Sequence, residues 1–316
     1  MNIDNSVSIV GCGISGIFAA LELKKSGIEN IKLFDKSRGL GGRLATRRAN
    51  EGKFDHGIQY IRLDGISHLP EIEDLIKNSI LIETKVPNLF VGYDGMTSIA
   101  KFLAKDLNIY KEFKLLSIGD GPDSMEMSFE NGEKINTESL ILSSPIKQSI
   151  EILERSSVKI SQPKLDSIKK LEYYPTIIIM VESESPINLN NEFITECSEG
   201  LFSSITDNFT KGISKKENFY TLVCSHDFSS KNFEKDYDYI NSHLQAELNI
   251  MFKGEYNILS NHKWRYSTPK DFYLSDDSLQ ISSNSFIGMC GDIFTNGKFD
   301  GAIKSGISIA KKLLIK

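Results

Sequence analysis

Residues 7–48 read VSIVGCGISGIFAALELKKSGIENIKLFDKSRGLGGRLATRR, and this stretch decides the fold of the first part of the chain. The apolar run at 7–10 predicts a strand. Gly11, Gly13 and Gly16 follow in the spacing G-x-G-x-x-G, and apolar residues then recur at helical intervals. Such glycines permit a tight turn, close approach of the backbone to a pyrophosphate, and close packing of helix on strand. The whole pattern predicts a dinucleotide site at a helix N-terminus, whereas a glycine turn used only for packing is the simpler alternative.

Asp35 ends the second apolar strand of this stretch, about 20 residues beyond the glycines. A carboxylate at that place can accept hydrogen bonds from the hydroxyls of an adenosine ribose. Because two anions would repel each other, Asp35 also argues against a 2′-phosphate on this ribose.

The composition describes an ordinary globular chain of 316 residues, 40% hydrophobic and 25% charged, which is long enough for one large or two ordinary domains. A net charge of −5 does not favour nucleic acid or an anionic membrane as a partner. We expect a cytoplasmic protein, because no apolar run reaches the ~20 residues of a membrane span and no signal peptide fits before Val7. Four cysteines without a C-x-x-C pair indicate free thiols and no metal site.

A second glycine-rich turn, KSRGLGGRLATRR at 36–48, follows Asp35 directly. A nicotinamide dehydrogenase has no evident use for it. A longer dinucleotide, clamped along its phosphates by Arg43, would use it. The alternative is a solvated basic loop.

The last segment, FIGMCGDIFTNGKFDGAIKSGISIAKKLLIK at 286–316, predicts a strand, a turn at Gly291 and Asp292, and an amphipathic helix from Gly301. Asp292 could bind a polyol hydroxyl, and the dipole of the helix could stabilise negative charge on a reduced isoalloxazine. Gly306 inside this helix predicts close packing. A helix that merely closes the sheet is the alternative.

These motifs, together with FDHGIQY at 54–60, GYDGM at 92–96 and HKWRY at 262–266, make the chain resemble the renalase-like branch of the FAD-dependent amine oxidoreductases. The middle of the chain departs from that pattern, most clearly at 222–236. The resemblance implies non-covalent FAD. The residues it places on the cofactor are Gly11, Gly13, Ser15, Gly16, Asp35, Lys36, Gly42, Arg43, Asp55, His56, Gly57, Gly291, Asp292, Gly301 and Ala302.

The implied architecture is α/β. A discontinuous Rossmann-type FAD-binding domain with a parallel sheet comprises 1–66, 94–150 and 265–316, and a second α+β substrate domain with an antiparallel sheet comprises 67–93 and 151–264. Strands are expected at 109–118, 173–183 and in two runs between 201 and 225, and a helix at 236–252.

The chain has no second G-x-G-x-x-G and no C-x-x-x-x-C dithiol, so the substrate itself must meet the flavin, and dioxygen is the simplest electron acceptor. The resemblance favours oxidation of 2- or 6-dihydro isomers of NAD(P), a hydride transfer that needs no protein base. The expected pocket residues are Gln59, Tyr60, His262, Trp264 and Arg265. A flavin amine or polyamine oxidase and a non-catalytic flavin-binding redox sensor remain alternatives, and the oligomeric state stays open.

Overall fold

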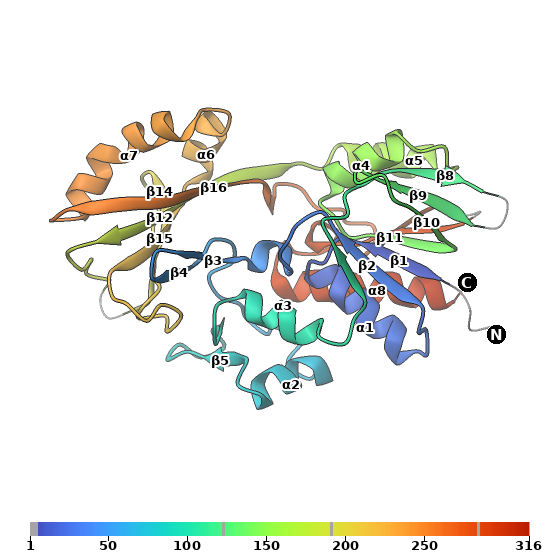
Figure 1. Ribbon diagram of the computed structural model, residues 1–316, viewed down its shortest axis with the longest axis horizontal. Coiled ribbons are helices and arrows are strands. Elements are labelled where there is room, and N and C mark those ends of the chain that lie inside the picture. The colour runs from blue at the N-terminus through green and yellow to red at the C-terminus, as the bar shows by residue number, and fades with distance from the viewer. Residues whose placement is uncertain (1–5, 122–123, 190–191, 283–284, 316) are drawn as a thin grey trace.

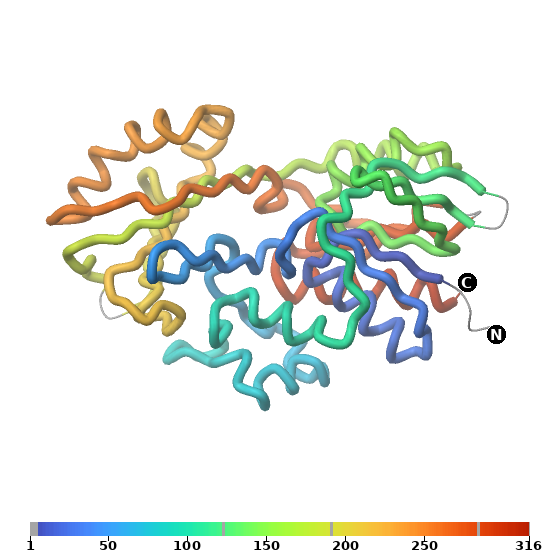
Figure 2. The backbone as a smooth tube through the Cα atoms, viewed as in Figure 1, coloured from blue at the N-terminus to red at the C-terminus, as the bar shows by residue number. Residues whose placement is uncertain are grey.

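The computed structural model describes residues 6–121, 124–189, 192–282 and 285–315. The chain forms two parts, a nucleotide-binding part around a mostly parallel sheet and a second part around an antiparallel sheet (Figure 1). Two long paired strands run from one part to the other, and the tube in Figure 2 shows the chain crossing between them several times. The predicted α/β fold with an antiparallel second domain is confirmed.

The first sheet has β1 near its centre, between β11 and β2, in parallel register. Its strands, in order across the sheet, are β17 (Leu279–Ser282), β18 (Phe286–Met289), β11 (Ser139–Leu142), β1 (Val7–Val10), β2 (Ile31–Asp35) and β7 (Ile109–Lys111). The two helices α1 (Ile14–Lys25) and α8 (Phe299–Leu314) pack against each other. A Cβ on Gly306 would lie 2.2 Å from the carbonyl oxygen of Ser15, so the expected close packing is confirmed.

A three-stranded antiparallel sheet and two helices extend the nucleotide-binding part. They are β8 (Leu115–Asp120), β9 (Met125–Phe129), β10 (Lys134–Thr137), α4 (Ile146–Glu154) and α5 (Gln162–Lys169). The strand expected at 109–118 is two strands, because Glu112 adopts a φ of +63° and turns the chain. Leu165 and Ile168 of α5 belong to this core, so α5 packs here although its residues were expected in the substrate domain.

Residues 67–93 also pack differently from the predicted division. This segment holds α2 (Pro70–Lys77), β5 (Leu81–Glu83) and β6 (Phe90–Gly92), and α3 (Thr97–Leu103) follows it. Ile72 and Leu75 share an apolar cluster with Phe18 of α1 and Ile99 of α3. The segment is therefore attached to the nucleotide-binding part by its apolar face.

The second sheet is antiparallel, and its strands are β13 (Ile194–Glu196), β14 (Phe202–Asp207), β15 (Phe219–Cys224), β12 (Tyr173–Ser183) and β16 (Tyr256–Pro269), in that order. The helices α6 (His226–Asn232) and α7 (Tyr237–Met251) lie beside it (Figure 1). Ile240, Leu244 and Leu248 of α7 are fully buried on one face of the sheet.

The hairpin of β3 (Thr46–Ala49) and β4 (Gly52–Asp55) covers the other face of this sheet. Phe54 packs on Met180 and Phe219, and a Cβ on Gly52 would lie 2.2 Å from the Phe219 ring. The hairpin follows the second glycine turn in the chain. It therefore places residues 55–60 between the nucleotide-binding turns and the antiparallel sheet.

Candidate flavin site and active site

The first glycine turn has the geometry that a dinucleotide requires. Gly11 has a φ of +108°, and a Cβ on Gly16 would lie 2.1 Å from the Gly11 carbonyl oxygen, so helix and strand pack too closely for any side chain. A Cβ on Gly13 would meet no atom within 4 Å. Gly13 therefore faces open space at the carboxyl end of β1, where its missing side chain leaves room for a phosphate.

The N-terminus of α1 is ready to bind an anion. Its N-cap residue, Gly13, makes no side-chain capping bond, and no acidic residue lies in the first turn. Unpaired N–H groups at such a helix end attract phosphate. Ser15 in that turn is buried, and its Oγ lies 3.0 Å from Oγ of Ser143. The residues present thus fit a pyrophosphate.

Asp35 links the two glycine-rich turns. One carboxylate oxygen accepts a hydrogen bond from the N–H of Cys12 and the other from the N–H of Ser37, both at 2.8 Å. A carboxylate has further lone pairs, so ribose hydroxyls could still donate to it. Lys36 points elsewhere, because its exposed ammonium donates to Gln148 at 3.1 Å.

The second glycine turn lies directly against the first. The N–H of Gly41 donates to the carbonyl of Cys12 at 2.9 Å, and a Cβ on Gly42 would lie 3.7 Å from Gly13 Cα. Both glycines have positive φ, +94° and +55°. The short helix η1 (Gly42–Leu44) starts here and carries Arg43.

Arg43 and Asp292 form one unit. The guanidinium donates two parallel hydrogen bonds to the carboxylate, at 2.7 and 2.6 Å, and a third of 2.7 Å to the carbonyl of Ser267. Asp292 begins the short helix η2 (Asp292–Phe294), and its side chain is only 5% exposed. This pair joins the second glycine turn, the end of β16 and the turn before α8. The two residues predicted for phosphate and ribityl contacts therefore share one location.

The remaining glycines and Ala302 divide into two kinds. Gly291 has a φ of +155°, and a Cβ there would meet no atom within 4 Å, so it leaves open space as Gly13 does. A Cβ on Gly57 would lie 1.9 Å from the Arg43 carbonyl oxygen, and one on Gly301 2.1 Å from Asn296 Oδ1. These two glycines are required by packing, and the half-buried Ala302 follows on α8.

Strand alternation gives the antiparallel sheet a second face of mixed polar and apolar residues, which we call the site face. Its residues share register across β12, β14, β15 and β16 and point away from α7. They are Thr176, Ile178, Met180, Ser204, Thr206, Thr221, Val223, Ser260, His262 and Trp264.

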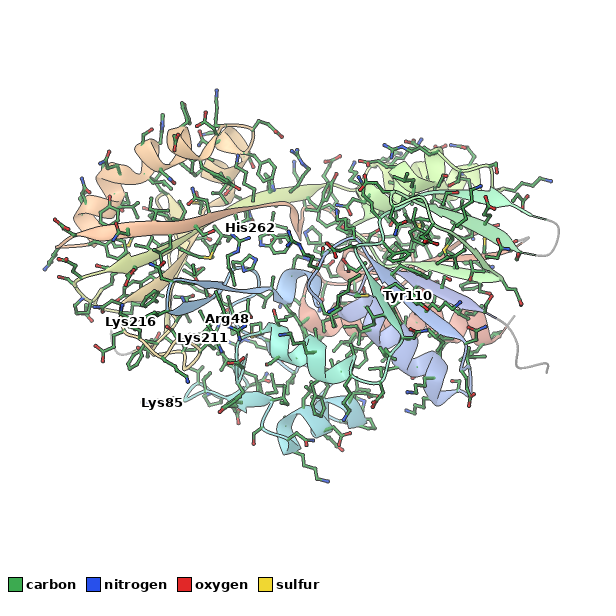
Figure 3. All side chains as sticks on the ribbon, in the orientation of Figure 1. Arg48, Lys85, Tyr110, Lys211, Lys216 and His262 are labelled. Atoms are coloured by element: carbon green, nitrogen blue, oxygen red, sulfur yellow. The ribbon has the colours of Figure 1, made fainter. Side chains whose placement is uncertain are left out.

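Two imidazoles and an indole cluster between this face and the β3–β4 hairpin. The His56 ring centroid lies 4.7 Å from that of His262 and 5.9 Å from that of Trp264, and the Trp264 Nε1–H donates to the His56 carbonyl at 2.5 Å. Burial lowers the pKa of His56 to about 3, with further contributions from His262 and Arg47. Burial, then the Arg47 charge, lowers the pKa of His262 to about 4. Both imidazoles are neutral at pH 7, and Figure 3 labels His262 at this junction.

Arg47 is a site residue that sequence reasoning missed. It shares a hairpin face with Phe54 and donates to Ser260 Oγ at 2.6 Å, so its charge lies at the site face. Arg48, the next residue, points the other way and its side chain is 71% exposed. The alternation of β3 could have separated the two arginines, but their run in the sequence resembles a solvated basic loop.

Asp55, Gln59 and Lys211 form a buried polar group. The Lys211 ammonium lies 2.7 Å from Asp55 Oδ2, and both side chains are fully buried. Gln59 donates to the carbonyls of Asp55 and Gly57, at 2.8 and 3.0 Å, and its Oε1 accepts from Lys211 at 3.4 Å. Lys211 was also missed, because a lysine in a polar loop gives no sign of burial in the sequence.

Tyr60 and Arg265 lie farther out. The Tyr60 hydroxyl donates to Glu196 at 2.5 Å, and burial followed by that carboxylate raises the pKa of Tyr60. Arg265 is exposed on the face opposite Trp264, where it pairs with Glu234 at 2.7 Å and lies over Phe233. Neighbouring residues of a strand point to opposite sides, so Arg265 does not line the site, and its predicted role is withdrawn.

Buried polar atoms without hydrogen-bond partners occur just after the β3–β4 hairpin, on the site face and just beyond β14. Within the described part of the chain, apart from Asp55 Oδ2 with its lysine, they are His56 Nδ1, Thr206 Oγ1 and Asn208 Oδ1. Such atoms are rare because each loses its bonds to water without replacement. The site face therefore keeps hydrogen-bonding capacity that a polar ligand or ordered water would use.

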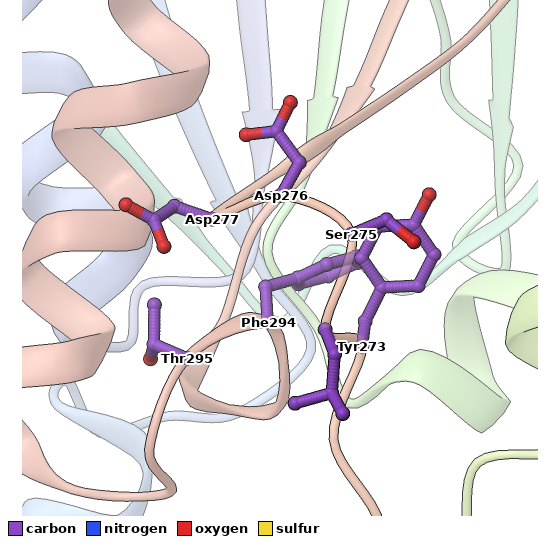
Figure 4. A pocket seen from close by; sticks show the side chains of 7 residues that line it. Tyr273, Ser275, Asp276, Asp277, Phe294 and Thr295 are labelled. Carbon is purple, nitrogen blue, oxygen red and sulfur yellow. The ribbon is translucent and has the colours of Figure 1, made fainter.

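One described cavity lies away from this site. It has a volume of about 430 Å³ and borders η2, with Tyr273, Leu274, Asp277, Phe294 and Thr295 in its wall (Figure 4). Asp276 in the same wall pairs with Lys312 at 2.7 Å. None of these residues belongs to the site face. The chemistry of the glycine turns and the partnerless atoms, and not cavity size, identifies the site.

Comparisons with known proteins agree with this geometry. A model of the NAD(P)-binding Rossmann-like domain matches residues 9–77. Renalase of Mus musculus is 23% identical over 337 aligned positions, which cover 97% of this chain and 98% of renalase. Among the described residues, no helix combines the length and apolar character that crossing a membrane requires.

Solved structures share the fold over 99% of both chains. A putative protoporphyrinogen oxidase from Exiguobacterium sp. 255-15 has a TM-score of 0.71 at 10% identity. A CLA-producing fatty acid isomerase from P. acnes has 0.68 at 9%, and a putrescine oxidase redesigned in its cofactor binding has 0.66 at 13%. The predicted resemblance to renalase and the predicted Rossmann-type fold are thereby confirmed, and the predicted oxidoreductase class agrees with these relatives.

Proposed function

We propose that this renalase-like chain binds FAD non-covalently and oxidises 2- or 6-dihydro isomers of NAD(P) to NAD(P)⁺, with dioxygen as the acceptor and hydrogen peroxide as the product. The observation that carries the proposal is the wall formed by Arg47, His56, His262 and Trp264. This wall is aromatic, and its charged member is the guanidinium of Arg47, which donates to a neutral hydroxyl. An anionic dihydropyridine dinucleotide suits it, and a protonated amine is repelled.

The chain's own residues would hold the cofactor. The N–H groups at Gly13 and the start of α1 would bind the pyrophosphate, Asp35 the adenosine ribose, and Arg43 with Asp292 the chain between phosphate and ring. FAD, when bound, supplies the hydride acceptor and the reaction with dioxygen. Burial raises the pKa of Cys12, Cys224 and Cys290, which disfavours the thiolate that a covalent link through sulfur would need.

The residues of the site face would orient the substrate. Trp264 offers a ring for stacking, and its own N–H is fixed on the carbonyl of His56. The partnerless Nδ1 of the neutral His56 can accept or donate one hydrogen bond to a carboxamide, depending on its tautomer. A dihydropyridine gives up its hydride without losing a proton to a base, so positioning and exclusion of water supply the rate.

The decisive experiment mixes the yellow oxidised protein anaerobically with 6-dihydro-NAD, 2-dihydro-NAD, ordinary 4-dihydro-NAD and a panel of amines, and follows flavin absorbance. We expect rapid bleaching by one or both isomers, and at least ~100-fold slower reaction with the ordinary form, whose reactive carbon is misplaced at the flavin. Air should restore the colour and release peroxide. Rapid reduction by an amine with inert isomers would support an amine oxidase, and silence towards all compounds a non-catalytic flavoprotein.

Substitutions at two neighbouring arginines test whether the charge at the site face supports the reaction. Arg47→Met removes the charge at the site face and should slow flavin reduction by the isomers ~10–100-fold, the loss of one charged contact. Arg48→Met removes an equal charge from the exposed side of the same strand and should leave the rate unchanged. Equal effects of the two substitutions would show that only the overall charge matters.

A further inference from the structure

We propose that Lys211 is a positioning residue that fixes the Gln59 side chain in the active site, an inference that rests on the proposed function. Lys211 belongs to the segment between β14 and β15 of the antiparallel sheet, and Gln59 follows the β3–β4 hairpin. The lysine reaches from one part of the molecule into the other. Figure 3 labels Lys211, whose ammonium meets Asp55 at the end of β4.

The burial of the pair requires an explanation beyond stability. Neither the Lys211 nor the Asp55 side chain is exposed to solvent, and burial is the largest influence on the pKa of Lys211, which it lowers against the pull of Asp55. Moving two charges out of water is so unfavourable that apolar residues of similar volume often serve stability as well or better. A buried pair in such a place is best explained by the geometry that it imposes.

That geometry converges on the amide of Gln59. Its Nε2 donates to two backbone carbonyls, and Oε1 accepts from the Lys211 ammonium, so each end of the amide has a partner and only one orientation satisfies both. Asp55 is fixed in turn, because Oδ1 accepts from the Thr46 hydroxyl at 2.5 Å and from the N–H of Met96 at 2.9 Å. Of the three side chains, Lys211 is the one that comes from a segment of the antiparallel sheet, between β14 and β15.

The segment that carries Lys211 is itself held firmly. Asp207 accepts hydrogen bonds from the N–H groups of Phe209 and Thr210 and from the Thr210 hydroxyl, and the N–H of Lys211 donates to the Asp207 carbonyl at 3.0 Å. The N–H of Ile213 donates to the Asn208 carbonyl. A rigid turn therefore delivers the ammonium to Gln59 from a fixed place on the sheet.

A double-mutant cycle between Lys211 and Gln59 tests this role. The rate constant of flavin reduction at saturating substrate is measured for Lys211→Met, Gln59→Met and the double variant. We expect Lys211→Met to lower the rate ~10–100-fold, as misplacement of a site group does, and the double variant to be no slower than Gln59→Met alone. Independent effects that multiply would overturn the proposal. Lys216→Met in the same segment, whose side chain is 53% exposed and pairs with Glu182, is the matched control and should react normally.

A second variant separates positioning from folding. Asp55→Asn with Lys211→Met removes both charges together, so no buried charge is left alone, and urea unfolding of the purified flavin-bound protein should show a folded chain. The same loss of rate is expected, and a wild-type rate in this variant would overturn the proposal. If no isomer reduces the wild-type flavin, the proposed function fails. The role of Lys211 is then tested by the wavelength of the visible absorbance band of bound flavin. Lys211→Met and Gln59→Met should then shift that band alike, and an unshifted band in Lys211→Met would refute it.

Discussion

The two faces of the antiparallel sheet differ although the same strands build both. Beneath α7, Ile179, Val181 and Leu222 are fully buried and pack with one another. On the site face, Thr206 is equally buried but has an unpaired hydroxyl, and His262 lies beside Trp264. One face gains stability from its apolar contacts, and the other retains polar groups for which the described residues provide no hydrogen-bond partner. The contrast indicates that the first face holds the fold and the second is shaped for a ligand.

The largest effect should come from the apolar face. Leu222→Ala leaves a cavity beneath α7 and should lower the free energy of unfolding by ~2–5 kcal/mol, measured by urea titration. Flavin reduction per folded molecule should stay unchanged. If Leu222→Ala kept normal stability but slowed flavin reduction, the assignment of stability to one face and activity to the other would be wrong.

The two histidines of the site should make the free energy of unfolding depend on pH in the acid range. The pKa of His56 in the folded chain is about 3 and that of His262 about 4, both below the ordinary value of about 6.5, so the unfolded chain binds more protons between these limits. Stability should therefore fall as pH drops from ~6.5 towards 3, by on the order of a few kcal/mol. Urea titrations at several pH values measure the slope, which His56→Gln should reduce and His243→Gln, at an exposed position, should not.

Substitutions at Arg43 and Asp292 test whether FAD binds where the site face meets the glycine turns. Arg43→Ala and Asp292→Asn each remove a charged bond at the end of β16 and should weaken FAD binding by ~1.5–3 kcal/mol, or ~10–100-fold, measured by flavin fluorescence during titration. Arg38→Ala, at a side chain that is 90% exposed, is the control. Normal FAD affinity in both variants would place the cofactor elsewhere.

The smallest effect on stability should come from a buried hydroxyl of the site face. Thr206→Val keeps the shape of the side chain and removes an oxygen without a partner, so the flavin-free protein should change by less than ~1 kcal/mol, towards greater stability. Thermal unfolding measures it. A loss as large as that of Leu222→Ala would mean that the hydroxyl has a structural partner.

How well the sequence predicts a feature depends on how far apart along the chain the residues that form it lie. The roles of Gly11 and Gly16 could be predicted because turn and packing lie within a few residues of each other. The attachment of 67–93 could not, since Ile72 meets partners on α1 and α3 that no local pattern identifies. Arg265 was misplaced because adjacent strand residues were assigned to one pocket, an error that strand alternation alone could have prevented. Lys211 required the tertiary structure.

The order of strands also governs how the protein can be made. Strand β1 lies beside β11, and β11 in turn beside β18, while α8 packs on α1, the helix that follows the first glycine turn. During synthesis the side of α1 that meets Gly306 therefore stays uncovered until α8, far along the chain, has been added. Chains truncated before residue 286 should depend on chaperones and bind no flavin, because β18 and α8 complete the scaffold around the first turn.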